Sequence, residues 1–158
     1  MTDGQSAEER LAALGLTLPE VVPPVAAYVP AVRTGNMVYT AGQVPVLAGQ
    51  LLATGKVGAE IGAAEAGALA RTCALNALAA VASVTGGLSA IRRIVKLTGF
   101  VASAPTFTQQ AQVVNGASEL LLEVFGDAGR HARSAVGMAV LPMDAPVEVE
   151  LIAEVRDI

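Results

Sequence analysis

The chain has 158 residues, of which 53% are hydrophobic and 15% are charged, and its formal net charge is −4. This length fits one domain with a continuous core. The acidic balance argues against nonspecific nucleic-acid binding, which relies on several phosphate contacts. The single cysteine and single histidine exclude an internal disulfide and leave no constellation for a metal site.

The apolar content is high for a soluble monomer of this size. The most apolar stretch, residues 61–88, is interrupted by Glu65, Arg71 and Asn76, so no segment offers the roughly 20 uninterrupted apolar residues of a membrane-spanning helix. We therefore expect a homo-oligomer whose interface covers the surplus, and no membrane partner. Residues 1–10 lack the basic and apolar regions of a secretory signal, which predicts a cytoplasmic protein.

The N-terminal residues predict a short capped helix. Ser6 precedes an acidic first turn, and Gly15 follows as a stop signal. Residues 18–32 are rich in proline and predict an extended approach to the first strand. We assign residues 1–20 to an N-terminal helical extension and residues 21–158 to a single domain.

The rest of the chain alternates strands and helices. The predicted elements are a strand at 37–46, a hairpin or loop at 47–58, a helix at 61–84, a strand at 91–103, a helix at 106–125, and two strands about residues 141–146. This order predicts an α+β or α/β sandwich with both long helices on one face of one sheet.

The last two strands alternate apolar with small or polar side chains, so their faces can be assigned. The face expected to meet the helices carries Val136, Met138, Val140, Val147, Val149 and Leu151. The opposite face carries Arg133, Ala135, Gly137, Ala139, Glu148 and Glu150. A face of small residues interrupted by charge suits a second sheet that approaches across a subunit boundary.

Arg133 is the residue of these strands that packing does not explain. A guanidinium cannot be deprotonated and is costly to bury without an anionic partner. That partner is either a carboxylate of this chain, from Glu148, Glu150 or Glu154, or the carboxylate of a substrate, and the residues alone favour neither. A simple hairpin between the two strands would place Arg133 across from about Glu154, not Glu148.

Two motifs carry a resemblance to a known family. The segment GNMVYTAGQVPV at 35–46 and the segment ARSAVGMAVLPMDAPVEVELIAEV at 132–155 resemble signatures of the RidA family, also called YjgF or endoribonuclease L-PSP, and the match runs over 24–155. The extra N-terminal helix and the HARSAV form resemble its longer, YjgF/chorismate-mutase-like branch. The resemblance implies a chorismate-mutase-like α+β fold and a homotrimer whose sheets form a central barrel, with one cleft at each subunit interface.

The resemblance also implies an activity: hydrolysis of reactive 2-imino and 2-enamino acids to 2-keto acids and ammonia, with no metal or cofactor. Arg133 matches the arginine that holds the substrate carboxylate, and Glu148 the acid that orients the attacking water. Tyr28 matches a tyrosine that lines the cleft, Asn115 a polar helix residue that faces the neighbouring subunit, and Gly42 a backbone N–H donor to substrate or water.

Each of these residues also has a purely structural interpretation. Glu148 fits an exposed strand carboxylate, Tyr28 a packing residue at a strand edge, Asn115 a capping or solvent-exposed amide, and Gly42 a strand bulge.

The chain departs from the family pattern at two positions of the expected pocket. Ala41 stands where well-studied imine deaminases have serine, and Ala135, expected to line the substrate pocket, stands where they often have cysteine. A lost hydroxyl removes a hydrogen bond worth roughly 0.5–1.5 kcal/mol. These replacements favour an alternative function, a non-catalytic protein that binds or senses a small carboxylate such as a 2-keto acid. An endoribonuclease that uses His131 as base is a third, weaker hypothesis.

Overall fold

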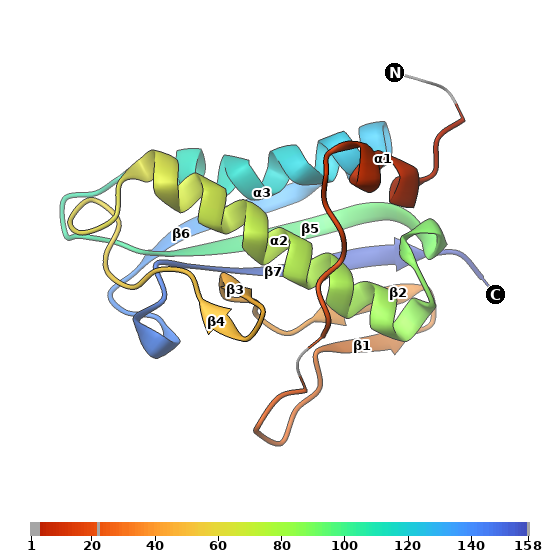
Figure 1. Ribbon diagram of the computed structural model, residues 1–158, viewed down its shortest axis with the longest axis horizontal. Coiled ribbons are helices and arrows are strands. Elements are labelled where there is room, and N and C mark those ends of the chain that lie inside the picture. The colour runs from red at the N-terminus through yellow and green to blue at the C-terminus, as the bar shows by residue number, and fades with distance from the viewer. Residues whose placement is uncertain (1–3, 22, 158) are drawn as a thin grey trace.

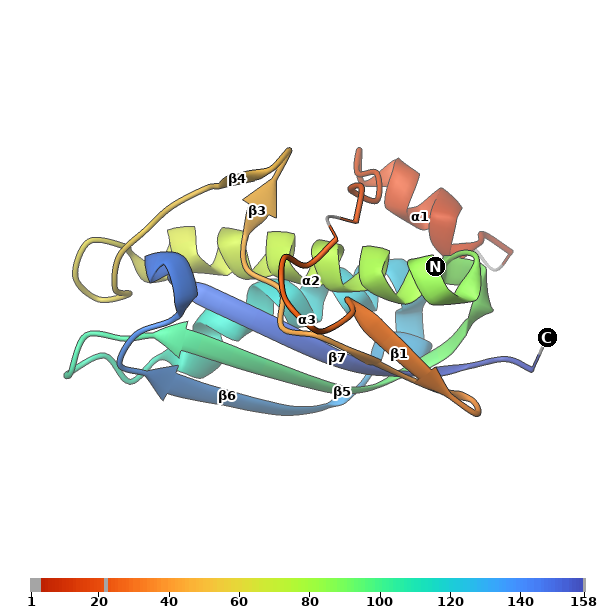
Figure 2. The same ribbon diagram turned by 90° about the horizontal axis from the view of Figure 1, so that it is seen from below.

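The computed structural model describes residues 4–21 and 23–157 and contains a mixed five-stranded sheet with two long helices on one face (Figure 1, Figure 2). The first three residues of the predicted extension 1–20 lie outside the described residues. The helices are α1 (Ala7–Ala13), α2 (Ala63–Thr85) and α3 (Gln110–Phe125). The sheet strands are β1 (Ala31–Thr34), β2 (Met37–Thr40), β5 (Ile91–Ala102), β6 (Ala132–Met138) and β7 (Val147–Val155), and a separate hairpin joins β3 (Val46–Leu47) to β4 (Gln50–Leu51).

The strand order is β1-β2-β7-β5-β6, and β5 runs parallel to β6 while the other pairs are antiparallel. The last two strands do not pair with each other, so the simple hairpin that would set Arg133 across from about Glu154 does not form. The short helix η3 (Pro142–Asp144) carries the chain across the end of β5, so β6 lies at one sheet edge and β7 on the other side of β5. Arg133 lies beside Leu97, and Glu148 lies beside Phe100.

The predicted face of β7 is confirmed, because Val147, Val149 and Leu151 are buried in the core beneath the helices. The predicted face of β6 is reversed. In register, Arg133 and Ala135 stand beside Leu97 and Gly99 of β5, whose side faces the helices, whereas Val136 on the opposite face is 41% exposed. The reason is that β6 is an edge strand with one neighbour, so its apolar residues need not face the helix layer.

Helix α2 is the core helix of the protein. It packs against β7 and α3, and its buried residues are mostly alanines and leucines. By length and composition alone α2 could cross a membrane, which differs from our expectation that no segment could, but 56% of its apolar window is buried inside the protein. The two long helices approach closely where a Cβ added to Gly116 would lie 1.9 Å from the backbone oxygen of Gly67.

The short helix α1 begins as predicted. The Ser6 hydroxyl accepts from the backbone N–H of Glu9, and the Glu9 carboxylate accepts from the N–H of Ser6, which completes a capping box. The α1 helix contacts α3, and Glu8 accepts a hydrogen bond from the backbone N–H of Ser89. Helix α3 begins four residues later than predicted, because residues 103–109 form a turn that the Gln110 side chain closes through the carbonyl of Phe107.

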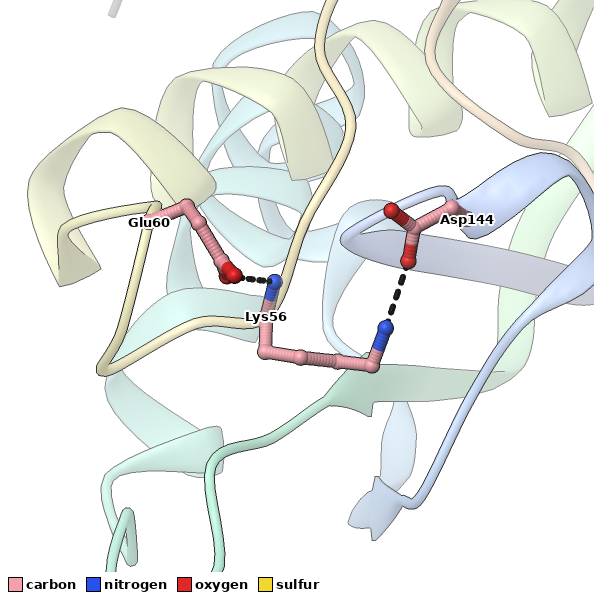
Figure 3. A network of polar contacts seen from close by, with 3 residues as sticks. All are labelled: Lys56, Glu60 and Asp144. Atoms are coloured by element: carbon pink, nitrogen blue, oxygen red, sulfur yellow. Dashed lines mark hydrogen bonds and ion pairs between the residues drawn. The ribbon is translucent and has the colours of Figure 1, made fainter.

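One end of the sheet is fastened by a polar network between two loops (Figure 3). The Lys56 ammonium pairs with the Asp144 carboxylate, and the backbone N–H of Lys56 donates to Glu60. The backbone N–H of Gly55 donates to the carbonyl of Asp144. Met143 and Asp144 have φ angles of 60° and 56°, in the left-handed region that disfavours side chains, so these contacts hold the turn that leads into β7.

Candidate functional site

Arg133 is held by helix α3 on the helix side of the sheet. Its Nη1 donates to Asn115 Oδ1 at 2.7 Å and to Ser118 Oγ at 3.2 Å, and its Nη2 donates to the backbone oxygen of Ala111 at 3.2 Å. These three acceptors lie on one face of α3, because they are spaced by three and four residues. The guanidinium is thereby directed along the helix, at the edge of the sheet.

The Arg133 guanidinium has no anionic partner in the described part of the chain. The salt bridges found there, within 4.0 Å, join other residues, and Glu154 pairs with Arg92 at 3.3 Å. The predicted alternative of an ion pair with Glu148, Glu150 or Glu154 is therefore wrong within one subunit. A half-buried cation that is bound by neutral acceptors alone is suited to receive an anion from outside the subunit.

Glu148 lies on the opposite face of the sheet, against the backbone of Gly42. A Cβ added to Gly42 would stand 1.9 Å from Glu148 Oε1, so glycine is needed for the carboxyl to sit there. Among the described residues, neither the Glu148 carboxyl nor the Gly42 N–H has a hydrogen-bond partner. An acid and a free backbone donor therefore lie side by side at the surface.

Burial raises the pKa of the Glu148 carboxyl above its ordinary value of 4.5, and the nearby charge of Glu150 raises it further. The shift moves the titration of this acid towards neutral pH, which is the direction that suits a group that both accepts and donates a proton.

The segment that carries Gly42 is fixed on both sides. Gln43 exchanges backbone hydrogen bonds with Val149 at 2.8 and 2.9 Å. From helix α2, the Asn76 side chain donates to the backbone oxygens of Val44 at 3.1 Å and Val46 at 2.8 Å. The half-buried Asn76 thus anchors this segment to the core helix.

The remaining predicted site residues lie in different surroundings. Tyr28 is 58% exposed on the loop before β1, which projects from the body of the molecule in Figure 1. Ala135 is half-buried against the core, on the same face as Arg133. Ala41, at the start of the Gly42 segment, donates its N–H to the carbonyl of Pro30.

The predicted site residues therefore form two groups in one subunit. Arg133, Asn115 and Ala135 come together on the helix side at the β6 edge, while Glu148 and Gly42 come together on the open side of the sheet. The sheet separates the two groups. No group of three or more His, Cys, Asp or Glu side chains that could hold a metal ion occurs within residues 4–21 and 23–157.

Sequence reasoning missed Ser118 and Asn76 as structural partners of the site. Ser118 follows Asn115 by three residues on a predicted helix, so helical spacing alone would have placed both on the face towards Arg133. Asn76 interrupts an apolar helix, and a buried amide needs hydrogen-bond partners.

The chain is similar to known proteins over most of its length. A family model described as "YjgF/chorismate mutase-like, putative endoribonuclease" matches residues 8–155. Protein TCP17 of Trypanosoma cruzi is 43% identical over 145 residues, which cover 91% of this chain and 91% of that protein.

Two solved structures extend the comparison. A Shewanella oneidensis protein named "putative endoribonuclease" superposes with a TM-score of 0.92 and 38% identity, covering 96% of this chain and all of the other. Escherichia coli TdcF, solved with bound serine, has a TM-score of 0.62 and 28% identity over 85% of this chain and 92% of its own. The chain therefore belongs to the YjgF/chorismate mutase-like family, with the mixed-sheet α+β fold of that family.

Proposed function

We propose that this protein hydrolyses small 2-imino and 2-enamino acids to 2-keto acids and ammonia, in a cleft between two subunits of a homotrimer. The observation that carries the proposal is the half-buried Arg133 guanidinium, which neutral groups of α3 hold in place and which no carboxylate of the described chain neutralises. The serine bound to TdcF, a small molecule with a carboxylate, supports the same substrate class.

Arg133 binds the substrate carboxylate. Its Nε–H and one Nη2–H have no partner in the described residues, and these two nitrogens form the edge of a guanidinium that a carboxylate engages through two parallel bonds. Such a bond pair fixes the position of the neighbouring C2 atom of the substrate and with it the C=N bond.

Glu148 activates water and manages the proton. The substrate reacts as the protonated imine, which a 2-enamino acid reaches when its C3 takes a proton from solvent. The Glu148 carboxylate takes a proton from water as the water oxygen bonds to C2 and the C=N π electrons move to nitrogen, which forms a tetrahedral amino alcohol. The carboxyl then returns this proton to the nitrogen. As the C–N bond breaks, the hydroxyl proton passes to the Glu148 carboxylate and from there to solvent, so that ammonia leaves and the 2-keto acid remains. The free backbone N–H of Gly42 lies beside the Glu148 carboxyl. It donates a hydrogen bond to the attacking water or to the oxygen that this water becomes on C2.

The cleft is formed by two copies, because Arg133 and Glu148 of one copy lie on opposite faces of the same sheet. We infer that Arg133, with Asn115 and Ala135, comes from one subunit and that Glu148 and Gly42 come from its neighbour. The uncovered sheet face carries exposed apolar side chains such as Val136 and Tyr39, which association would bury. Tyr28, on its projecting loop, reaches the same cleft.

Mixed oligomers test both the chemistry and the shared cleft. Arg133→Ala and Glu148→Gln proteins are each expected to lose turnover of imines that an amino-acid oxidase generates in the assay. When the two variants are unfolded together and refolded as mixed trimers, about one quarter of the sites regain both native residues. We expect activity to return to about that fraction.

The control refolds the double variant with an equal amount of wild-type protein. A shared site needs two neighbouring wild-type chains, so the intact sites should fall from one half to about one quarter of the total. If each variant alone keeps wild-type turnover, the proposed reaction is wrong. If the single variants are inactive and the mixture stays inactive, the cleft is not shared between subunits in the way we propose.

Non-catalytic binding of a small carboxylate is the second candidate. It is favoured by Ala41 and Ala135, which supply no hydroxyl or thiol to the pocket. Calorimetry that detects binding of a 2-keto acid lost in Arg133→Ala, together with absent imine turnover by the wild-type protein, would select this function.

A further inference from the structure

The hydroxyl of Ser118 links Arg133 to the single histidine of the chain. Ser118 Oγ lies 3.2 Å from Arg133 Nη1 and 2.9 Å from His131 Nε2. On its other side, His131 Nδ1 lies 2.6 Å from the backbone oxygen of Gly129. The three side chains come from α3, from β6 and from the loop that precedes β6.

The direction of each hydrogen bond follows from the chemistry of the groups. A backbone carbonyl only accepts, so His131 Nδ1 carries a proton, and in the neutral ring Nε2 is an acceptor. Ser118 accepts from Arg133 and has one proton, which it donates to Nε2. Donation therefore runs in one direction, from Arg133 Nη1 through Ser118 and His131 to the carbonyl of Gly129, and each of these three hydrogen bonds joins one donor to one acceptor.

Ser118 differs in this respect from the hydroxyls of the other long helix. Thr72, Ser83 and Thr85 on α2 each donate to a backbone carbonyl of the preceding turn. This local bond is the usual choice of a hydroxyl inside a helix. The hydroxyl of Ser118 instead points away from its own helix backbone, towards His131 and Arg133.

We propose that Ser118 and His131 are positioning residues for Arg133, which hold the guanidinium so that its Nε and Nη2 edge stays open to a carboxylate. His131 orients the Ser118 hydroxyl, and Ser118 fixes Nη1 together with Asn115. The ligand in this inference is the carboxylate of the proposed function, so the inference rests on that function. The inference adds Ser118 and His131 to the proposed site. It assigns His131 to the positioning of Arg133 rather than to proton transfer on RNA.

The test is binding of pyruvate, a small 2-keto acid, to the full-length protein by calorimetry. Ser118→Ala and His131→Leu should each weaken binding by about two- to tenfold, the loss expected for one hydrogen bond. Ser118→Thr keeps the hydroxyl and should restore binding. Ser83→Ala, the same change on α2 away from Arg133, is the matched control and should bind as wild type.

A double variant shows whether His131 acts through Ser118. Ser118 and His131 belong to one series of hydrogen bonds that ends on Arg133. The double variant Ser118→Ala with His131→Leu should therefore lose no more affinity for pyruvate than the weaker-binding single variant. Additive losses would overturn the inference, as would wild-type affinity in Ser118→Ala. In turnover assays KM should rise while kcat stays near wild type, because the orientation of a binding group is lost.

A ligand-independent measurement completes the test. The chain has one histidine, so its ring nitrogen NMR signals belong to His131, and couplings to the ring protons distinguish Nδ1 from Nε2. With the ring neutral, Nδ1 should be protonated and Nε2 unprotonated; the opposite tautomer would overturn the inference. If Arg133→Ala binds pyruvate as tightly as wild type, the proposed function itself fails, whereas loss in Arg133→Ala with full affinity in Ser118→Ala refutes only the positioning role.

Discussion

Gly42→Ala should remove activity without unfolding the protein, because the added methyl group displaces the Glu148 carboxyl. The new Cβ would lie 1.9 Å from Glu148 Oε1, 2.8 Å from its Cδ and 3.2 Å from its Cγ. The φ angle of Gly42 lies outside the left-handed region, so alanine fits the backbone. The clash falls on the mobile end of a side chain rather than on the main chain.

The distance that the Glu148 carboxyl must move determines how far kcat falls. Ordinary contact with a Cβ begins at 3.4 Å, so the carboxyl oxygen must retreat by about 1.5 Å. A misplacement of about 1 Å in a reacting group costs about 10²-fold in rate, so we expect kcat to fall about 10²-fold. A changed rotamer of Glu148 costs about 0.5–1.5 kcal/mol of stability, so the variant stays folded.

Three measurements on one preparation check this reasoning: imine turnover, affinity for pyruvate and the thermal unfolding midpoint. Turnover should fall while pyruvate affinity at Arg133 stays near wild type. Gly62→Ala is the control, since an added Cβ there meets nothing within 4 Å and its φ of −78° is ordinary. Wild-type turnover in Gly42→Ala, with the carboxyl displaced, would refute the role of Glu148.

Gly116→Ala should instead destabilise the fold, because the same 1.9 Å overlap falls on the backbone oxygen of Gly67, which cannot swing aside. We expect a loss of about 1–3 kcal/mol in denaturant unfolding, and an unchanged midpoint would contradict the close helix crossing. Glu148→Gln should change the pH dependence of stability. Burial and then Glu150 raise the pKa of Glu148 above 4.5, so the native protein binds this proton more tightly than the unfolded chain. The contribution of Glu148 to stability therefore falls as pH rises from about 4.5 through its raised pKa. Relative to wild type, Glu148→Gln should gain stability from pH 4 to pH 8, and a constant difference would refute the shift.

Local signals in the sequence predicted most of the elements, because neighbouring residues fix them. The predicted strand at 37–46 is an exception, since it ends at Thr40, and β1 was expected only as an extended approach. The cap at Ser6, the long helix α2 and the strand β5 follow from capping chemistry, apolar spacing and turn residues. Both long helices lie on one sheet face, as predicted (Figure 2). The pairing of β6 was not predictable in this way, since its partner β5 is about 35 residues distant along the chain and the intervening residues give no sign of it.

The long-range pairing of β6 also explains why the sequence did not predict how the site residues are grouped. Alternation assigned the faces of β7 correctly because both of its neighbours are strands and its inward residues, such as Val149, are fully buried. It failed for β6, where Arg133 faces the helices and Val136 does not. Residue type suggested that Arg133 needs an anion, but only the pairing of β6 shows that Glu148 of the same chain is on the wrong side to supply it.

The separation of Arg133 from Glu148 has a chemical consequence. Within one subunit the sheet keeps the guanidinium from pairing with the carboxylate, a pairing that would lower the pKa of Glu148. With the sheet between them, Arg133 keeps two N–H donors, and burial keeps the pKa of Glu148 raised. Association would then bring cation and acid to one cleft only in the geometry that the assembly sets. Turnover per subunit should therefore fall as dilution separates the subunits, and turnover measured beside light scattering on one dilution series checks this.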